Sequence, residues 1–176
     1  MLREFVAGAI LIAAAFAAPA PSRAQASSLD LERFDGRWFE IERSPNDLQK
    51  SCWRAQIDLT PQAPRRYDVL VTCTRSRGGP VETLRASARP ADGDNARLRF
   101  TLRGLLSFGG LAGQNYRVWD HDPAYRWAIL ALPNRSDWWI WHRDRDVPQA
   151  ERNRLLARAR ALGLDIGGSV RTPPPG

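Results

Sequence analysis

Apolar and polar residues alternate with a period of two in several short segments of the chain. Tyr67, Val69 and Val71 fall on one side of such a segment, with Asp68 and Thr72 on the other. Similar segments, rich in β-branched and aromatic residues, recur about every 8 to 15 residues between clusters of Pro, Gly, Asn and Asp. This spacing predicts an all-β meander of eight strands, at Trp38–Arg43, Trp53–Thr60, Tyr67–Thr74, Glu82–Ala88, Ala96–Leu102, Gln114–Trp119, Tyr125–Leu132 and Trp138–Arg143.

Eight antiparallel strands with one apolar face can close into an up-and-down barrel. Closure leaves no unpaired edge and an interior just wide enough for one small ligand. A single C-terminal helix is predicted over Pro148–Leu162, with Asp146 as its N-cap and Gly163 at its end. We expect this helix to pack on the outside of the barrel through Ala150, Leu155, Ala159 and Leu162.

The first 26 residues have the pattern of a cleavable secretory signal. Arg3 precedes an uninterrupted small and apolar run over Phe5–Ala18, and Ala24–Ala26 offers an A-x-A cleavage site. No cysteine precedes Cys52, so no residue is available for lipoprotein acylation. We therefore expect a soluble periplasmic or secreted protein, with a signal peptide over 1–26, one domain over 27–171 and a flexible proline-rich tail over 172–176.

Two cysteines remain in the exported chain, Cys52 and Cys73. An even count in an oxidising compartment favours a disulfide between them. A hairpin turn at Gln62–Pro64 would bring them opposite each other. The alternative is a free catalytic thiol, which a nearby histidine would have to activate, and neither cysteine has one nearby in the sequence.

Basic residues outnumber acidic residues in the exported chain, but they are scattered along it. Removing Arg3, Glu4 and Arg23 leaves 24 basic and 18 acidic side chains, a net charge of +6. Such scatter argues against a nucleic-acid partner, because nucleic-acid binders concentrate charge on one face. The predicted helix does carry a group of arginines, which either form a solvated face or attract anionic lipid head groups: Arg152, Arg154, Arg158 and Arg160.

Three separated motifs resemble those of the lipocalin family. Phe34–Ile41 resembles the G-x-W segment that opens the first strand, in the form typical of the bacterial and apolipoprotein-D-like branch. Tyr116–Ala128 is similar to the second motif, an aspartate between the sixth and seventh strands followed closely by a tyrosine. Trp139–Arg143 resembles the third, an arginine that ends the eighth strand. Their order and the trailing helix fit as well, so the resemblance covers essentially the whole exported chain.

The resemblance implies a barrel closed at one end by structural residues. Trp38 and Arg143 would stack there, Asp122 would accept hydrogen bonds from backbone donors of its turn, and Gly36 and Tyr125 belong to the same motifs. Period two then predicts an inward-facing, ligand-contacting set, although each member could be core packing alone. This set is Glu40, Ala55, Ile57, Val69, Val71, Tyr116, Val118, Ala128, Leu130, Trp139 and Trp141. A buried Glu40 would need a partner such as an arginine or a tyrosine hydroxyl.

The opposite end of the barrel would be its mouth. We expect it to be ringed by the loops Ser44–Ser51, Ser76–Pro80, Arg103–Gly113 and Pro133–Ser136. The apolar, glycine-rich Arg103–Gly113 loop either folds onto the rim or acts as a mobile lid or membrane-touching tip. A peripheral membrane contact is thus one expected partner of the protein.

The predicted function is that of a carrier for a small apolar or amphipathic molecule, not an enzyme. By resemblance to the bacterial branch, the ligand would be a fatty acid or a lysophospholipid, used in lipid storage, transport or envelope maintenance, with no cofactor or metal. Catalytic residues are scarce, since His121 lies in a turn and His142 should face away from the interior. Two alternatives remain: a lipocalin-like enzyme acting on a lipid, and a barrel filled by its tryptophans that binds a partner.

Overall fold

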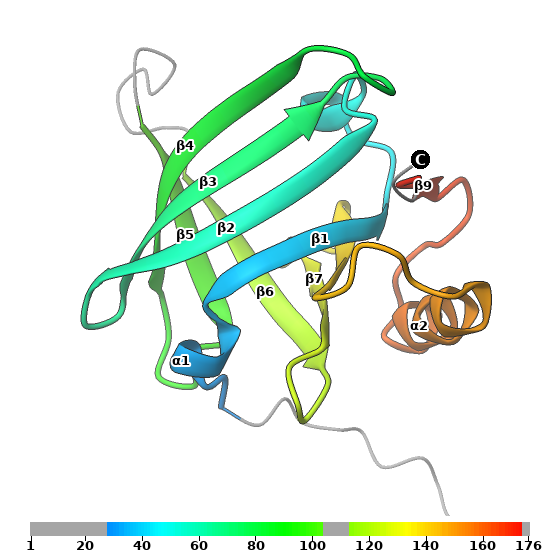
Figure 1. The fold of residues 1–176 in the computed structure, drawn as a ribbon. Coiled ribbons are helices and arrows are strands. Elements are labelled where there is room, and N and C mark those ends of the chain that lie inside the picture. Colours follow the sequence, from blue (N-terminus) through cyan, green and yellow to red (C-terminus); the bar gives the residue numbers. More distant parts are fainter. Residues whose placement is uncertain (1–27, 104–112, 174–176) are drawn as a thin grey trace, which may run out of the picture.

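The computed structural model describes residues 28–103 and 113–173, and its eight long strands form a closed barrel (Figure 1). Each strand pairs antiparallel with the next along the chain, and β1 also pairs with both β2 and β8, which closes the sheet. This confirms the predicted up-and-down barrel. The strands are β1 (Gly36–Arg43), β2 (Arg54–Ala63), β3 (Arg66–Thr74), β4 (Val81–Pro90), β5 (Arg97–Leu102), β6 (Gly113–His121), β7 (Trp127–Ala131) and β8 (Trp138–His142).

Alternation along the strands separates two apolar clusters. One fills the inside of the barrel, with members such as Val69, Val118 and Leu130. The other includes Ile129 and Ile140, whose side chains point outward. Because strands β1, β7 and β8 bury both faces, their outward side chains need a second layer to cover them.

Helix α2 (Gln149–Ala161) supplies that second layer on the outside of the barrel, as predicted (Figure 1). Two details of the prediction were wrong. The helix begins at Gln149, one residue later than expected, and its N-cap residue is Pro148 rather than Asp146. Its buried positions are Arg152, Leu155 and Ala159, while Ala150 is exposed. The buried stripe therefore includes an arginine, whose guanidinium donates hydrogen bonds to backbone carbonyl groups.

Three short elements were not predicted: α1 (Leu31–Phe34), the 3-10 helix η1 (Asp47–Gln49) and β9 (Val170–Arg171). Strand β9 pairs with the end of β1. The flexible tail predicted from residue 172 was also wrong at its start, because Thr172 is only 3% exposed. Its amide donates to the carbonyl of Ile41, and its hydroxyl donates to Glu40. Residues 174–176 lie outside the described part of the chain.

Two local irregularities change the register that simple alternation implies. The β2–β3 turn lies at Pro64 and Arg65 rather than at Gln62–Pro64, so Cys73 pairs in the ladder with Ala55. Cys52 lies just before β2 and still forms the predicted disulfide with Cys73, across a Cα–Cα distance of 5.5 Å. The second irregularity is a bulge in β1, where Glu40 faces Trp141 and Glu42 faces Ile140.

Candidate ligand-binding site

One end of the barrel is closed by Trp38 and Arg143. The Cζ atom of Arg143 lies 3.7 Å from the ring centroid of Trp38, which is completely buried. The same guanidinium donates hydrogen bonds to the carbonyl groups of Arg33, Arg37 and Tyr125. A positively charged group over an indole face is attracted to the ring. Arg143 thereby joins α1, β1 and the β6–β7 turn to the end of β8.

Gly36 and the β6–β7 turn complete this closed end. Gly36 has a φ of +85°, and a Cβ atom there would lie 3.4 Å from the guanidinium of Arg143. Asp122 accepts hydrogen bonds from the amide and the guanidinium of Arg126, which lowers the pKa of its carboxyl group. Tyr125 lies in the turn rather than in the predicted seventh strand, and its hydroxyl accepts a hydrogen bond from the amide of Asp30.

The predicted lining residues divide into two groups by depth. Most are buried, and all of these but Ala55 belong to the inner cluster: Ala55, Ile57, Val69, Val118, Ala128, Leu130, Trp139 and Trp141. Toward the mouth, Val71 and Tyr116 are only partly buried although they face inward. An inward side chain that water can reach borders open space, so the mouth half of the barrel has free space beside these residues. A smaller pocket, of about 10 Å³, lies toward the closed end between Phe34, Leu59 and Tyr67.

Sequence analysis missed three inward residues in that half. Leu84, Phe100 and Leu102 lie on β4 and β5, for which no lining residue was predicted. Leu84 pairs with Val71, and Leu102 pairs with the buried Ala86. The alternation of Leu98, Phe100 and Leu102 along β5 would have identified two of them.

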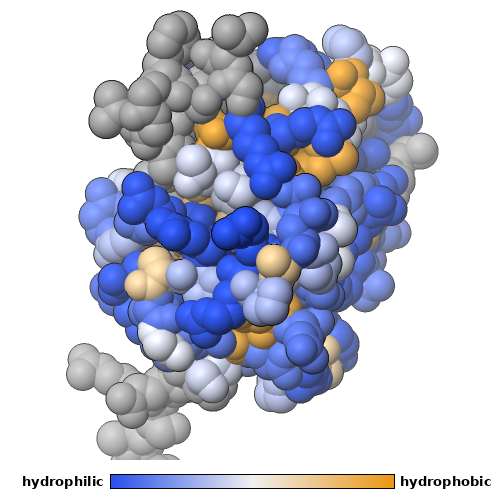
Figure 2. Space-filling model, turned by 90° about the vertical axis from the view of Figure 1, so that its left-hand side faces the viewer, coloured by the Kyte–Doolittle hydropathy of each residue, from blue (hydrophilic) through white to orange (hydrophobic). Residues whose placement is uncertain are grey.

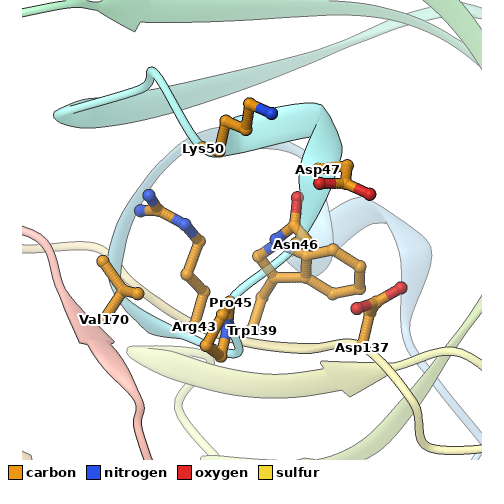
Figure 3. Close-up of a pocket in the computed structure, with 8 residues that line it drawn as sticks. All are labelled: Arg43, Pro45, Asn46, Asp47, Lys50, Asp137, Trp139 and Val170. Carbon is orange, nitrogen blue, oxygen red and sulfur yellow. The ribbon is translucent and has the colours of Figure 1, made fainter.

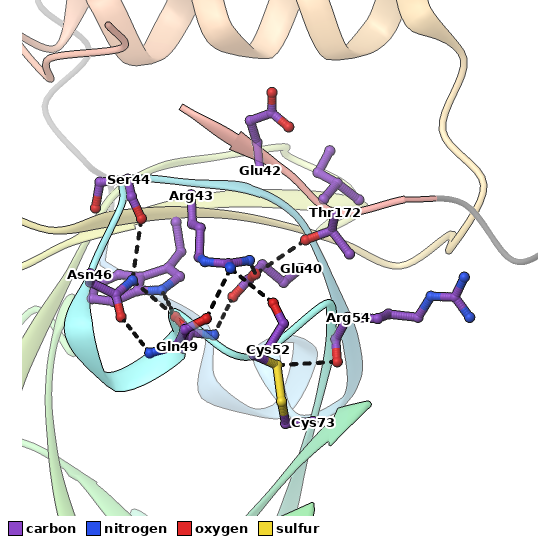
Figure 4. A network of polar contacts seen from close by, with 12 residues as sticks. Glu40, Glu42, Arg43, Ser44, Asn46, Gln49, Cys52, Arg54, Cys73 and Thr172 are labelled. Atoms are coloured by element: carbon purple, nitrogen blue, oxygen red, sulfur yellow. Dashed lines mark hydrogen bonds and ion pairs between the residues drawn. A yellow bond between two sulfur atoms is a disulfide. The ribbon is translucent and has the colours of Figure 1, made fainter. Parts of the chain in front are cut away.

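A buried ion pair lies at the inner edge of the mouth (Figure 4). Nη1 of Arg43 is 2.7 Å from Oε1 of Glu40, and the two side chains are 4% and 1% exposed. Residues three apart on a regular strand would face opposite sides, so the bulge after Glu40 is what brings both side chains inward. The partner that a buried Glu40 requires is therefore an arginine from its own strand.

Gln49 of η1 connects this ion pair to Trp139 on the neighbouring strand β8 (Figure 4). Its amide nitrogen donates to Glu40 over 2.7 Å, and its amide oxygen accepts from the indole N–H of Trp139 over 2.6 Å. Arg43 donates to the carbonyl groups of Gln49 and Cys52. The β1–β2 loop is thus held across the mouth by side chains from β1, β8 and the disulfide-linked Cys52.

Burial changes the protonation of two groups in this region. It raises the pKa of Glu40, although Arg43, Gln49 and Thr172 act in the opposite direction. It raises the pKa of Tyr116 to about 12, so that the phenol keeps its proton at physiological pH. The interior therefore offers an uncharged hydroxyl near an apolar wall and one internally neutralised ion pair.

A cavity of about 580 Å³ lies beside the β1–β2 loop, where it borders Trp139 and Arg43 (Figure 3). Figure 3 shows basic Arg43 and Lys50 on one side, acidic Asp47 and Asp137 on the other, and Asn46 with the ring of Trp139 between them. The cavity is therefore divided by charge, with an aromatic face between the two halves.

The described residues contain no group of three or more His, Cys, Asp or Glu side chains that could hold a metal ion. His142 lies on the outer side of β8, and its Nδ1 accepts a hydrogen bond from the amide of Asp144. Within residues 28–103 and 113–173, no helix is long and apolar enough to cross a membrane. The greater part of the Arg103–Gly113 loop, predicted as a lid or membrane contact, lies outside the described residues.

This protein is a closed up-and-down barrel with an apolar interior, and an indole and a guanidinium close one end. These features define a class of small β-barrels in which the candidate ligand site is the interior of the barrel. The chain belongs to the lipocalin family, since a family model described as Lipocalin-like domain matches residues 29–174.

Individual relatives agree with this assignment. The chain is 28% identical over 146 residues to protein R877 of Acanthamoeba polyphaga mimivirus, which covers 82% of this chain and 85% of that protein. It is also 28% identical over 149 residues to temperature-induced lipocalin-1 of Arabidopsis thaliana, covering 82% and 79% of the two chains. Insecticyanin from the tobacco hornworm Manduca sexta has the same fold, with a TM-score of 0.65, 13% identity and coverage of 84% and 82%. These relatives are viral, plant and insect proteins, so they support the family rather than one branch of it.

Proposed function

We propose that this protein is a carrier for a single-chain amphiphile, and that a lysophospholipid fits it better than a fatty acid. The observation that supports the choice is the charge-divided cavity at the mouth, next to an apolar interior. The acyl chain would lie along the partly buried inward residues of the mouth half, and the head group would occupy the cavity.

Burial of the acyl chain supplies enough free energy for useful affinity. A 16-carbon chain would gain roughly 13 kcal/mol gross, at about 0.8 kcal/mol per methylene group. The loss of translational and conformational freedom on binding removes a large part of this gain, and about micromolar affinity remains. The wall for the chain would come from Val71, Leu84, Phe100, Leu102 and Tyr116, with the deeper predicted residues forming the floor.

The head group is the part that distinguishes the two ligand classes. A phosphate has Lys50 as its charged partner, with Nε of Arg43 as a further donor, because Nε has no hydrogen-bond partner among the described residues while both Nη atoms are occupied. A substituted ammonium has Asp47, Asp137 and the face of Trp139. A fatty acid carboxylate would use only the basic side and would leave two aspartates without a cation. In this proposal, Glu40 positions Arg43 and does not itself contact the ligand, because its oxygens already accept from Arg43, Gln49 and Thr172.

The proposal extends to location and branch. The apolar N-terminal run followed by A-x-A supports export, and the Cys52–Cys73 disulfide is consistent with an oxidising compartment. A periplasmic or secreted carrier of this kind would serve lipid transport or envelope maintenance. The Phe34–Ile41 segment supports placing it in the bacterial, apolipoprotein-D-like branch.

Ligand displacement tests the proposal. Delipidated protein is loaded with a fluorescent fatty acid and titrated with lysophosphatidylethanolamine or with palmitate. We expect displacement by both, with the lysophospholipid about tenfold tighter, a difference of about 1.4 kcal/mol. The double variant D47N/D137N should lose this preference while it still binds palmitate. The matched control is D144N/D146N, which removes two exposed carboxylates after β8, at the closed end.

The outcomes separate the parts of the proposal. Absence of displacement by any amphiphile would contradict the carrier function and favour a filled barrel. Tighter binding of palmitate, unaffected by D47N/D137N, would contradict the head-group assignment alone. Conversion of the added lipid to product, followed by mass spectrometry, would replace the carrier with an enzyme.

A further inference from the structure

The outer surface of β4, β5 and β6 carries a set of arginines. Along β4 and β5 the inward positions include Ala86, Ala88, Leu98 and Phe100, so the alternate positions point outward. The face that β4 and β5 present in Figure 2 is covered mostly by hydrophilic residues. We call the outward set the arginine face; it consists of Arg85, Arg89, Arg97, Arg99, Arg103 and Arg117.

Carboxylates neutralise only half of the arginine face. Arg103 pairs with Asp68 at 2.5 Å, while Arg97 and Arg117 have looser pairs with Asp92 and Asp94 at 3.9 and 4.0 Å. Arg85, Arg89 and Arg99 are exposed and have no carboxylate partner among the described residues. Three positive charges therefore remain unneutralised on one side of the barrel.

The strand register places arginines of this face directly opposite one another, which adds electrostatic repulsion. Arg89 lies directly opposite Arg99 in the β4–β5 pair, and Arg97 lies opposite Arg117 in the β5–β6 pair. Like charges directly across a pair of strands are destabilising. Two arginines of the helix, by contrast, have close carboxylates: Arg158 with Asp120 at 2.6 Å and Arg154 with Glu151 at 2.6 Å. An external anion would remove the repulsion that this register creates.

We propose that the arginine face docks on the phosphate-rich surface of an anionic phospholipid membrane. Guanidinium groups bind phosphate through paired hydrogen bonds, and the arginines spread over three strands instead of converging on a pocket, which suits a flat partner. Between them lie Thr83, Ser87, Thr101 and Asn115, which have no aromatic ring for stacking a nucleic-acid base. The nearest outward ring, Trp119 on β6, is half-buried and already has the guanidinium groups of Arg117 and Arg135 over it.

An apolar residue on the same strand favours a membrane as well. Val81 is 59% exposed, lies at the mouth end of β4, and shares the outward parity of Arg85 and Arg89. A surface that combines arginine with an exposed apolar side chain matches the head-group and acyl boundary of a bilayer. This docking does not require that the barrel hold a lipid.

Vesicle flotation tests the docking with the full exported chain. The probe is a vesicle of phosphatidylcholine with about one third phosphatidylglycerol, compared with pure phosphatidylcholine, at low and high salt. The variant R85Q/R89Q/R99Q removes the unpaired charges, and the control R154Q/R158Q/R160Q removes the same charge from α2. We expect the face variant to lose about 100-fold in binding, because each basic residue near such a surface contributes about fivefold. The helix control should stay within about threefold of the parent protein.

Circular dichroism should show that both variants remain folded. Equal losses in the two triple variants would overturn the proposal, because net charge alone would then explain binding. So would equal binding to pure phosphatidylcholine, or binding to heparin or DNA through these arginines without binding to vesicles. Ligand displacement in the face variant should match the parent protein, so a failure of docking and a failure of the carrier function are distinguishable.

Discussion

At the scale of single residues, Arg143 is the side chain on which the closed end depends. Its guanidinium lies over Trp38 and donates to three carbonyl groups from three segments. A lysine in its place keeps the positive charge but has no planar fork with which to satisfy three separate acceptors. The stacking and the hydrogen bonds should therefore be lost together.

We expect R143K to lower the free energy of unfolding by about 2 to 4 kcal/mol, from the lost cation–π contact and the unpaired carbonyl groups. Urea unfolding followed by tryptophan fluorescence measures this loss. The matched control is R145K, since Arg145 is exposed and lies over Phe39 at 4.6 Å. Equal stability of R143K and the parent protein would show that the contact between Arg143 and Trp38 at the closed end does not stabilise the fold.

His142 gives a second residue-scale prediction, on pH. Burial lowers the pKa of His142, so the unfolded chain binds a proton at a pH where the folded chain does not. The contribution of this residue to stability is therefore complete above the ordinary histidine pKa of about 6.5 and is lost as the pH falls through the folded value. H142Q should show a smaller loss of stability between pH 7.5 and 5.5 than the parent protein, measured by urea unfolding.

The chain contains one other histidine, His121, which is the last residue of β6. H121Q is measured beside H142Q, and an equal loss of pH dependence in the two variants would contradict the assignment to His142. An unchanged pH dependence in H142Q would assign the effect to carboxyl groups instead.

At the scale of elements, Arg152 determines how α2 sits on the barrel. It is buried on the inner side of the helix, donates to the carbonyl groups of Ile41 and Val147, and lies 3.8 Å from Glu42. The bulge in β1 leaves Ile41 as an extra residue in the pairing with β8, and Arg152 binds its carbonyl oxygen. The helix therefore docks through a polar contact at the same irregularity that brings Glu40 and Arg43 together.

We expect R152M to cost about 3 to 5 kcal/mol in the free energy of unfolding, because it removes the buried partner of Glu42 and leaves that carboxylate with only Arg171, across the β1–β9 pair. The double variant E42Q/R152M should recover part of this loss, since the unpaired charge is then absent. R160M, at an exposed position of the same helix, should change stability by less than about 0.5 kcal/mol. A double variant as unstable as R152M would show that the carbonyl contacts, not the charge, dominate.

At the scale of the whole molecule, the Cys52–Cys73 disulfide restricts the unfolded chain and holds the β1–β2 loop on the barrel. The two residues are 21 apart in sequence. Closing a loop of this size stabilises a fold by about 3 kcal/mol in the chain-entropy model. The carbonyl group of Cys52 also accepts from Arg43, so the link supports the ion pair at the mouth.

We expect C52S/C73S to unfold at lower guanidinium concentration than the oxidised parent, by about 3 kcal/mol in free energy. Reduction of the parent protein should reproduce the loss and should have no effect on the double variant. If reduction left the parent protein unchanged, the disulfide would have to be absent from the protein in solution.

Much of the barrel could be predicted because its signals are local. The alternation of Tyr67, Val69 and Val71 predicts which side of β3 faces the apolar interior, and the same holds for the other strands. The placement of Arg152 could not be predicted in this way, because an arginine on a helix is ordinarily exposed and only the carbonyl of Ile41 explains its burial. The turn at Pro64 and Arg65 was missed for a related reason: a turn one or two residues away is equally compatible with the flanking residues.

The sequence by itself determined the eight strands, the inside and outside of the barrel, the trailing helix and the disulfide, because these depend on residue type and short-range periodicity. Only the tertiary structure decided the composition of the mouth. Glu40 and Arg43 share the interior because of a bulge, and Gln49 reaches Glu40 and Trp139 because the β1–β2 loop folds across the opening. Such contacts join segments up to 90 residues apart, and no local pattern records them.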